Sequence, residues 1–154
     1  MRLLRSILIF KIGLYAGLAA AAALMKRSLA SRGDEESDEV ALVAIFDGVK
    51  LQSRARGFKG GSMLAWYGGI EVDLTEAELA PGAHLNLTAL FGGIAIRIPA
   101  GWRVESTAKA LAGGVAVKTR DAEGPDAPTI TIEGLAALGG IAIGAKTPEP
   151  APTP

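Results

Sequence analysis

Leu90-Phe91-Gly92-Gly93-Ile94 is the clearest copy of a motif that occurs five times between Val43 and Ile143. Each copy combines an apolar residue, a turn that contains glycine, and β-branched residues on alternate positions after the turn. The last glycines of the copies, at positions 48, 69, 93, 114 and 140, are separated by 21, 24, 21 and 26 residues. Such spacing is typical of one repeat for each coil of a solenoid. We therefore expect an all-β, β-solenoid-like stack of about five short repeats.

The residues after each turn alternate between apolar and polar or small side chains, as in Ile94, Ile96 and Ile98. This two-residue period predicts that every turn is followed by a strand with one buried face.

Glycine at the turns has a physical cause, because a sharp corner requires a positive φ or a close approach of neighbouring coils. Gly93, for example, is expected at positive φ. The aromatic residues before the glycines, Phe46, Tyr67 and Phe91, are expected to stack on one another in the core. The expected structural turn residues are Gly48, Gly68, Gly69, Gly92, Gly93, Gly113, Gly114, Gly139 and Gly140.

The composition limits the functions open to the chain. Its 154 residues, 49% of them hydrophobic, suffice for one small domain and one membrane-proximal segment. With 16 Lys and Arg against 16 Asp and Glu the formal charge is zero, which argues against nucleic acid as a partner, since phosphate binding needs a clustered basic excess. The absence of cysteine excludes disulfides, thiolate catalysis and Cys-ligated zinc.

An apolar segment from Ile7 to Met25 follows the N-terminal flank, residues 1–6. Its 19 residues are close to the roughly 20 needed to cross a bilayer as a helix, so we expect a transmembrane anchor over residues 7–25. A cleaved signal peptide with Ser28-Leu29-Ala30 as its cleavage site is the alternative. Lys26 and Arg27 lie just before that site, where charge is disfavoured, and therefore favour the uncleaved anchor. Basic residues are nearly balanced on the two sides of the segment, so the positive-inside rule leaves the orientation open.

Two segments with few apolar residues flank the repeats. Residues 26–40 contain the acidic run from Asp34 to Glu39 and are typical of a solvated linker. Residues 147–154 have proline on alternate positions and are expected to form an extended, disordered tail. The β-repeat domain is therefore expected over residues 41–146.

Two stretches around the turns are typical of a known family. They are Ile98-Pro99-Ala100-Gly101-Trp102-Arg103-Val104, and Ala44-Ile45-Phe46-Asp47-Gly48-Val49 followed by a basic stretch and Ala65-Trp66-Tyr67-Gly68-Gly69-Ile70. Over residues 41–146 the chain resembles the C-terminal domain of the cell wall-active antibiotics response family, the LiaF-like or toast-rack proteins. The resemblance implies a β-rich domain attached to a membrane segment in bacterial envelope-stress signalling, where some members restrain a sensor histidine kinase. This chain has one short apolar segment instead of several transmembrane helices, and the family supplies no catalytic residues.

Four cations with no intervening acid stand between Val49 and Gly61, namely Lys50, Arg54, Arg56 and Lys59. Our hypothesis is that they bind anionic headgroups or an acidic partner. The alternative is a structural role, in which they form a solvated end of the solenoid or hold the acidic run in place.

The remaining candidates for chemistry are few. His84 is out of phase with Leu85 and Leu87, so we expect it to face solvent, without a second histidine to complete a metal site. Glu71 and Asp73 share one face of a strand, but glycosidase chemistry also requires a cleft and a raised pKa. A hydrated strand face is the preferred interpretation of this pair.

The sequence predicts a membrane-anchored, non-enzymatic interaction module in cell-envelope stress sensing or signalling, without catalytic, cofactor or metal sites. Its expected partners are the membrane and a sensor kinase or other envelope-stress membrane protein. By analogy with the family, we expect the β domain on the cytoplasmic side. A homo-oligomeric, membrane-associated scaffold that assembles through the open ends of the coil stack is the alternative.

Overall fold

The computed structural model describes residues 9, 12–17, 19–21, 23–24, 31–119, 122 and 124–145, which fall into two compact units, residues 1–30 and 31–154. In the first unit the described residues are helical, and their large apolar side chains, among them Ile12, Tyr15 and Leu24, are exposed. Among all described residues, no helix is long and apolar enough to cross a membrane. Parts of the predicted anchor, and the whole tail from 147 to 154, lie outside the described residues.

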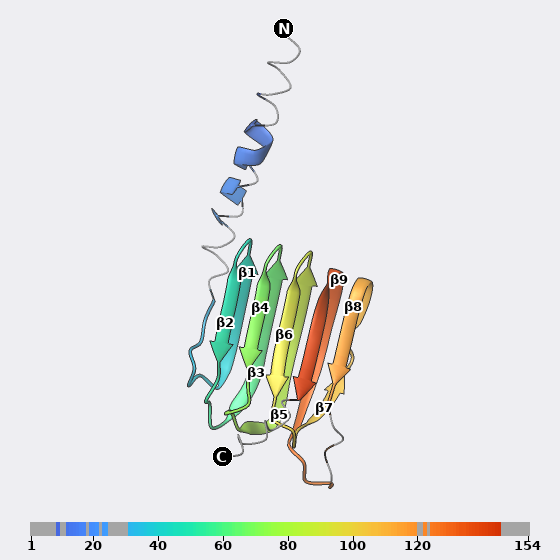
Figure 1. Ribbon diagram of the computed structural model, residues 1–154. Coiled ribbons are helices and arrows are strands. Elements are labelled where there is room, and N and C mark those ends of the chain that lie inside the picture. Colours follow the sequence, from blue (N-terminus) through green and yellow to red (C-terminus); the bar gives the residue numbers. More distant parts are fainter. Residues whose placement is uncertain are drawn as a thin grey trace, which may run out of the picture. The chain divides into compact units, whose positions relative to one another are not determined.

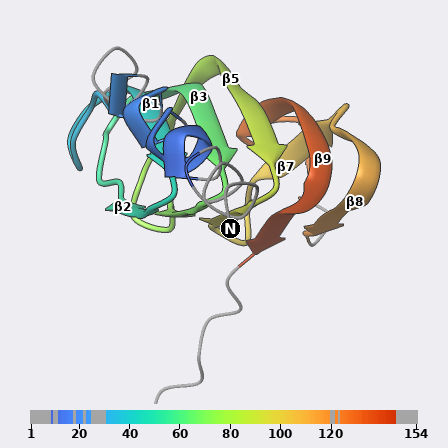
Figure 2. The same ribbon diagram turned by 90° about the horizontal axis from the view of Figure 1, so that it is seen from above.

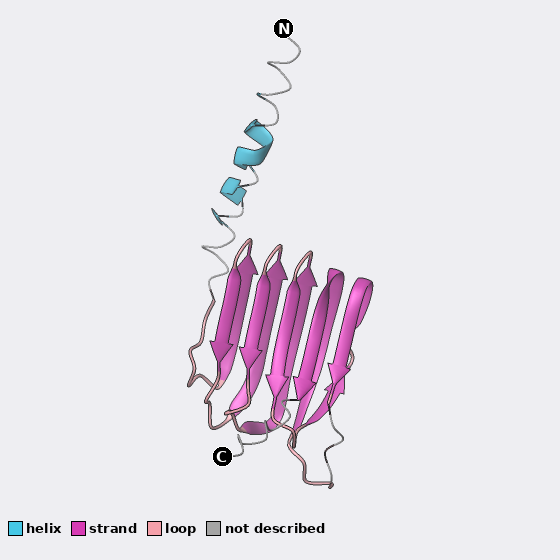
Figure 3. Ribbon diagram, viewed as in Figure 1, coloured by secondary structure: helices cyan, strands magenta, loops and turns pink. Residues whose placement is uncertain are grey.

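The second unit consists almost entirely of strands (Figures 1 and 3). Their alternating burial, with a buried residue at every second position of most strands, matches the two-residue period of the sequence. The strands are β1 (Glu39–Ile45), β2 (Gly48–Gln52), β3 (Phe58–Trp66), β4 (Gly69–Asp73), β5 (Leu79–Leu90), β6 (Gly93–Ile98), β7 (Arg103–Ser106), β8 (Lys109–Lys118) and β9 (Thr129–Ala145).

All pairings between these strands are parallel, and they form a β-solenoid with two faces. β1, β3, β5 and the first half of β9 make one face, and β2, β4, β6 and the second half of β9 make the other. Figure 2 looks along the strands and shows β1, β3 and β5 on the side opposite β2. The predicted all-β solenoid is thus confirmed, with about four turns in place of the expected five.

The turns are not stacked in the order of the sequence. β9, the last strand of the chain, pairs with β5 and β6 on one side and with β7 and β8 on the other. The chain therefore passes over one level after β6, forms β7 and β8, and returns to fill the gap. The repeat copy around Gly113 and Gly114 consequently lies in the end strand β8, whose side chains are exposed except for the half-buried Val115.

Apolar ladders between the two faces form the core. On the second face, Ile70 is level with Ile94, and Ile94 with Ile141, while Val72, Ile96 and Ile143 form a second ladder. All six side chains are 2% exposed or less. In-register β-branched side chains pack well on pleated strands, which explains why isoleucine and valine recur at this point of each repeat.

Positive φ at four of the corners falls on the residue before the glycines, contrary to the prediction for Gly93, whereas in β8 the glycine itself, Gly113, has a φ of 139°. Phe46, Tyr67, Phe91 and Leu138 have φ angles of 52°, 52°, 55° and 55°. The following glycines at 68, 92 and 139 are needed for a different reason, the close approach of neighbouring turns. A Cβ on Gly92 would lie 2.1 Å from the carbonyl oxygen of Gly68, whereas a Cβ on Gly93 would meet nothing closer than 3.8 Å.

The first turn of the stack lacks this glycine, because no earlier turn of the described chain lies beside it. Its motif has Asp47 where later turns have the first glycine of the pair. The turn of β1 and β2 lies at the end of the stack, and among the described strands none pairs with it on its outer side, so position 47 does not face the backbone of an earlier turn. The next glycine along the stack, Gly68, has the carbonyl oxygen of Asp47 only 2.3 Å from an ideal Cβ position.

The two glycines of one turn give a matched test. Gly92→Ala should lower the free energy of unfolding by about 1–3 kcal/mol or more, because the added methyl group overlaps the backbone of the adjacent turn. Gly93→Ala, one residue away, should change it by only about 0.5 kcal/mol. Thermal unfolding of the two variants, followed by circular dichroism, measures the difference. Equal melting temperatures would contradict the close stacking of the corners.

Candidate interaction surface

A row of large apolar side chains runs along the corner that joins the two faces. This corner row consists of Phe46, Tyr67, Phe91 and Leu138, which are 55%, 48%, 47% and 58% exposed. The rings of Phe46 and Tyr67 stack with centroids 5.1 Å apart, and those of Tyr67 and Phe91 with centroids 4.7 Å apart. The predicted aromatic stack is therefore present, but it lies on the surface and not in the core.

The backbone places these side chains outside at an energetic cost. A left-handed conformation costs a residue with a Cβ about 1–2 kcal/mol, and glycine would adopt it without strain. Hydrogen bonds to the next turn hold three of these corners: the amides of Phe46, Tyr67 and Phe91 donate to the carbonyl oxygens of Trp66, Leu90 and Ala137, each at 3.1 Å. Strained, bulky, exposed residues at four successive corners indicate a surface used for contact.

An apolar groove of about 710 Å³ lies next to this corner, across the strands of the second face. Gly48, Gly69 and Gly93 begin β2, β4 and β6, and their partners in register, Gly140 and Gly114, lie inside β9 and β8. Ala95, Ala142 and Ala116 lie two residues after Gly93, Gly140 and Gly114. Since these residues have almost no side chain, the outer surface of the sheet is open along the stack. Lys50 and Glu71, the charged residues that line it, pair with each other at 3.2 Å.

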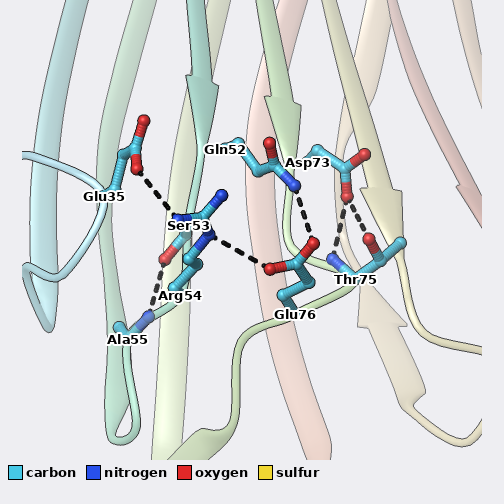
Figure 4. A network of polar contacts seen from close by, with 8 residues as sticks. All are labelled: Glu35, Gln52, Ser53, Arg54, Ala55, Asp73, Thr75 and Glu76. Carbon is cyan, nitrogen blue, oxygen red and sulfur yellow. Dashed lines mark hydrogen bonds and ion pairs between the residues drawn. The ribbon is translucent and has the colours of Figure 1, made fainter.

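Acids of the same domain pair with three of the four predicted interaction cations. Lys50 pairs with Glu71, which also pairs with Arg97 at 3.1 Å. Arg54 contacts Glu76 at 3.1 Å and Glu35 at 3.7 Å (Figure 4), and Lys59 contacts Asp38 at 3.7 Å. Within the described part of the chain, Arg56 has no carboxylate within 4.0 Å. Lys50, Arg54 and Lys59 thus pair with different acids, and their binding to headgroups or an acidic partner stays a prediction.

Ser31 and Arg32 lie along the exposed edge of β1, and the acidic run that follows, expected as part of a linker, bonds to residues 54 and 59. Arg32 and Ala41 exchange backbone hydrogen bonds of 2.6 and 2.8 Å, and the amides of Arg54 and Lys59 donate to carbonyl oxygens of Glu35 and Asp38. A hydrogen bond from the Ser37 hydroxyl to Asp34 lowers the pKa of this carboxyl group. The segment from residue 31 thus covers an edge that would otherwise be open to strand addition.

The other polar candidates have structural contacts. Asp73 accepts hydrogen bonds from the amide and hydroxyl of Thr75 at 2.9 and 2.5 Å (Figure 4). Its strand neighbour Glu71 is held by Lys50 and Arg97. His84 faces solvent, as predicted, and lies 3.5 Å from a carboxylate oxygen of Glu133.

β8 leaves a long edge of the solenoid open. Its partner is β9, and no described strand pairs with its other edge. Leu111, which bulges out of the pairing where β8 turns the corner, is 76% exposed. An uncovered apolar edge of this length can accept a further strand.

Comparisons of the chain with protein-family models, curated proteins and solved structures find no match. The resemblance to LiaF-like domains therefore depends on the sequence motifs alone.

Arg54 and Arg56 provide a matched pair for the role of the cations. Arg54→Gln should speed hydrogen exchange of the backbone amide at position 54, because it removes the ion pair with Glu35, whose carbonyl oxygen accepts a hydrogen bond from that amide. Its effect on overall stability should stay within about 0–1 kcal/mol, since the charges are exposed. Arg56→Gln should leave this exchange unchanged. An equal effect of both substitutions would show that the ion pairs do not hold the acidic run.

Proposed function

We propose that this protein is a membrane-anchored, non-enzymatic interaction module of the bacterial cell envelope, and that it acts in stress sensing or signalling. The observation that carries the proposal is the apolar groove that extends along the stack beside the corner row. Sites for small substrates are usually enclosed and place several convergent polar groups around the ligand. This groove is open and lined by backbone and small side chains, which suits an extended segment of a protein partner.

The polar surface supports the same proposal. Glu71, the carboxylate of the groove, is neutralised by Lys50 and Arg97, and Asp73 serves a turn. The cellular context comes from the sequence, through the apolar segment 7–25 and the resemblance to LiaF-like proteins. A sensor kinase or another envelope-stress membrane protein is the partner that this resemblance favours, with the β domain on the cytoplasmic side.

The open edge of β8 favours a second candidate, a self-associating scaffold. Two copies could add strand to strand at this edge, while the covered edge of β1 would limit growth from the other end. Affinity purification from solubilised membranes separates the two functions. Recovery of a kinase or other membrane protein supports the signalling module, and recovery of further copies of this chain alone supports the scaffold.

The full-length protein should sediment with membranes and resist extraction by alkaline carbonate, because 19 mostly apolar residues bury enough surface for stable insertion. Deletion of residues 7–25 should release it into the soluble fraction. A mature protein that begins near Ser31 would instead establish a cleaved signal peptide and contradict the anchor. A reporter fused after Pro154 determines the side of the membrane.

A further inference from the structure

We infer that the corner row is a lipid-contacting edge, which inserts into the interfacial layer of the bilayer and orients the solenoid with its axis parallel to the membrane. This inference rests on the proposed membrane attachment and adds which side of the β domain faces the lipid. Three features of the described residues support it: the chemistry of the row, its shape, and the place where the chain enters the domain.

The row has the chemistry of an interfacial anchor. Phe46, Tyr67, Phe91 and Leu138 occupy adjacent levels, because Trp66, Leu90 and Ala137, the residues before three of them, are strand partners. The exposed Leu111 extends the row by one level, since its neighbour Ala112 is the partner of Ala137. Aromatic and apolar side chains of this kind partition into the headgroup and upper acyl region of a bilayer.

The shape of the row favours contact with lipid over contact with a protein surface. The side chains project from the sharpest bend of each turn, in a single file, and are about half exposed. A ridge of this kind offers a protein partner little enclosed area, whereas lipid chains adapt around each ring. The backbone strain at four corners is consistent with a requirement for projecting side chains, because glycine would occupy the same backbone without cost.

The chain enters the domain beside this corner. The Ser31 hydroxyl accepts a hydrogen bond of 2.9 Å from the amide of Val43, three residues before Phe46. Because Arg32 pairs with Ala41, the chain followed backwards from Arg32 to Ser31 runs toward the corner. Only residues 26–30 separate Ser31 from the apolar segment, a span of at most about 20 Å. A segment that ends in the interfacial layer therefore keeps the corner row within reach of the headgroups.

The absence of cysteine in the chain allows a direct test by single-site labelling. Two single substitutions are made in the full-length protein. Phe91→Cys places the label in the corner row, and Glu78→Cys, at an exposed position at the opposite end of the turns, is the control. Each variant is labelled with an environment-sensitive fluorophore and reconstituted into vesicles of phosphatidylcholine with a minor share of phosphatidylglycerol. Nitroxide groups on the lipids, placed near the headgroup, serve as quenchers. We expect blue-shifted emission and several-fold stronger quenching for the label at position 91 than for the label at 78.

Carbonate extraction of the same vesicles separates the two claims. A protein that stays with the membrane while its label at 91 remains in water overturns the lipid-contacting edge and leaves the anchored module intact. A label at 91 that is shielded only by a second labelled copy, detected by energy transfer between copies, also overturns it. Loss of the protein on extraction refutes the attachment and, with it, this inference. Tyr67→Cys repeats the measurement if Phe91→Cys lowers the β-type circular dichroism signal.

Discussion

The contact on which the structure depends is the close approach of backbone to backbone at the corner. At each level after the first, the first glycine of a pair lies so near the carbonyl oxygen of an adjacent turn that an added methyl group could not fit. This approach allows the amides of Gly69, Gly93 and Gly140 to donate to carbonyl oxygens of Asp47, Gly68 and Gly92 at 3.0 to 3.1 Å. The hydrogen-bond ladder therefore continues through the bend, and both faces keep one register. In-register isoleucine ladders in the core follow from that register.

The same constraint produces the surface. A bend that lets the backbones touch puts the preceding residue in the left-handed conformation, with its side chain outside the core. The corner row and the neighbouring groove of glycine and alanine are thus two consequences of one local geometry. The function that we propose uses these two surfaces, the groove for a partner and the row for lipid.

Much of the fold could be predicted because each repeat carries the same sequence of glycine and apolar residues. The period of the glycine motifs predicts coils, and alternation such as Ile94, Ile96 and Ile98 predicts which residues are buried. The order of the turns could not be predicted, since every copy of the repeat offers a similar edge and its neighbours depend on tertiary packing. Local sequence is a weak guide where strand pairing decides the structure, because Gly60-Gly61 and Pro81-Gly82, dipeptides that are common in turns, lie inside β3 and β5.

The candidate surface was harder to predict than the fold. The sequence favours the core for Phe46, Tyr67 and Phe91, because they are apolar and recur with the repeat. Their exposure follows from their positive φ angles, which could not be predicted from the sequence. Leu138 in place of an aromatic residue could have indicated a surface position, because a row that accepts both side-chain shapes is not closely packed. The partners of Lys50, Arg54 and Lys59 come from neighbouring turns and from the acidic run, so only the folded register brings them together.

β9 lies between β6 and β8, and only this order makes the corner row continuous from Phe91 to Leu138. Double-cysteine variants in the otherwise cysteine-free chain test it most directly. Ala95 and Ala142 are exposed strand partners, and neighbouring strands lie within the Cα separation of a disulfide. We expect rapid oxidation of the variant with Ala95→Cys and Ala142→Cys, and no disulfide in the variant with Ala95→Cys and Ala116→Cys. A disulfide in the second variant and none in the first would show that the turns are stacked in chain order and that β9 does not lie between β6 and β8.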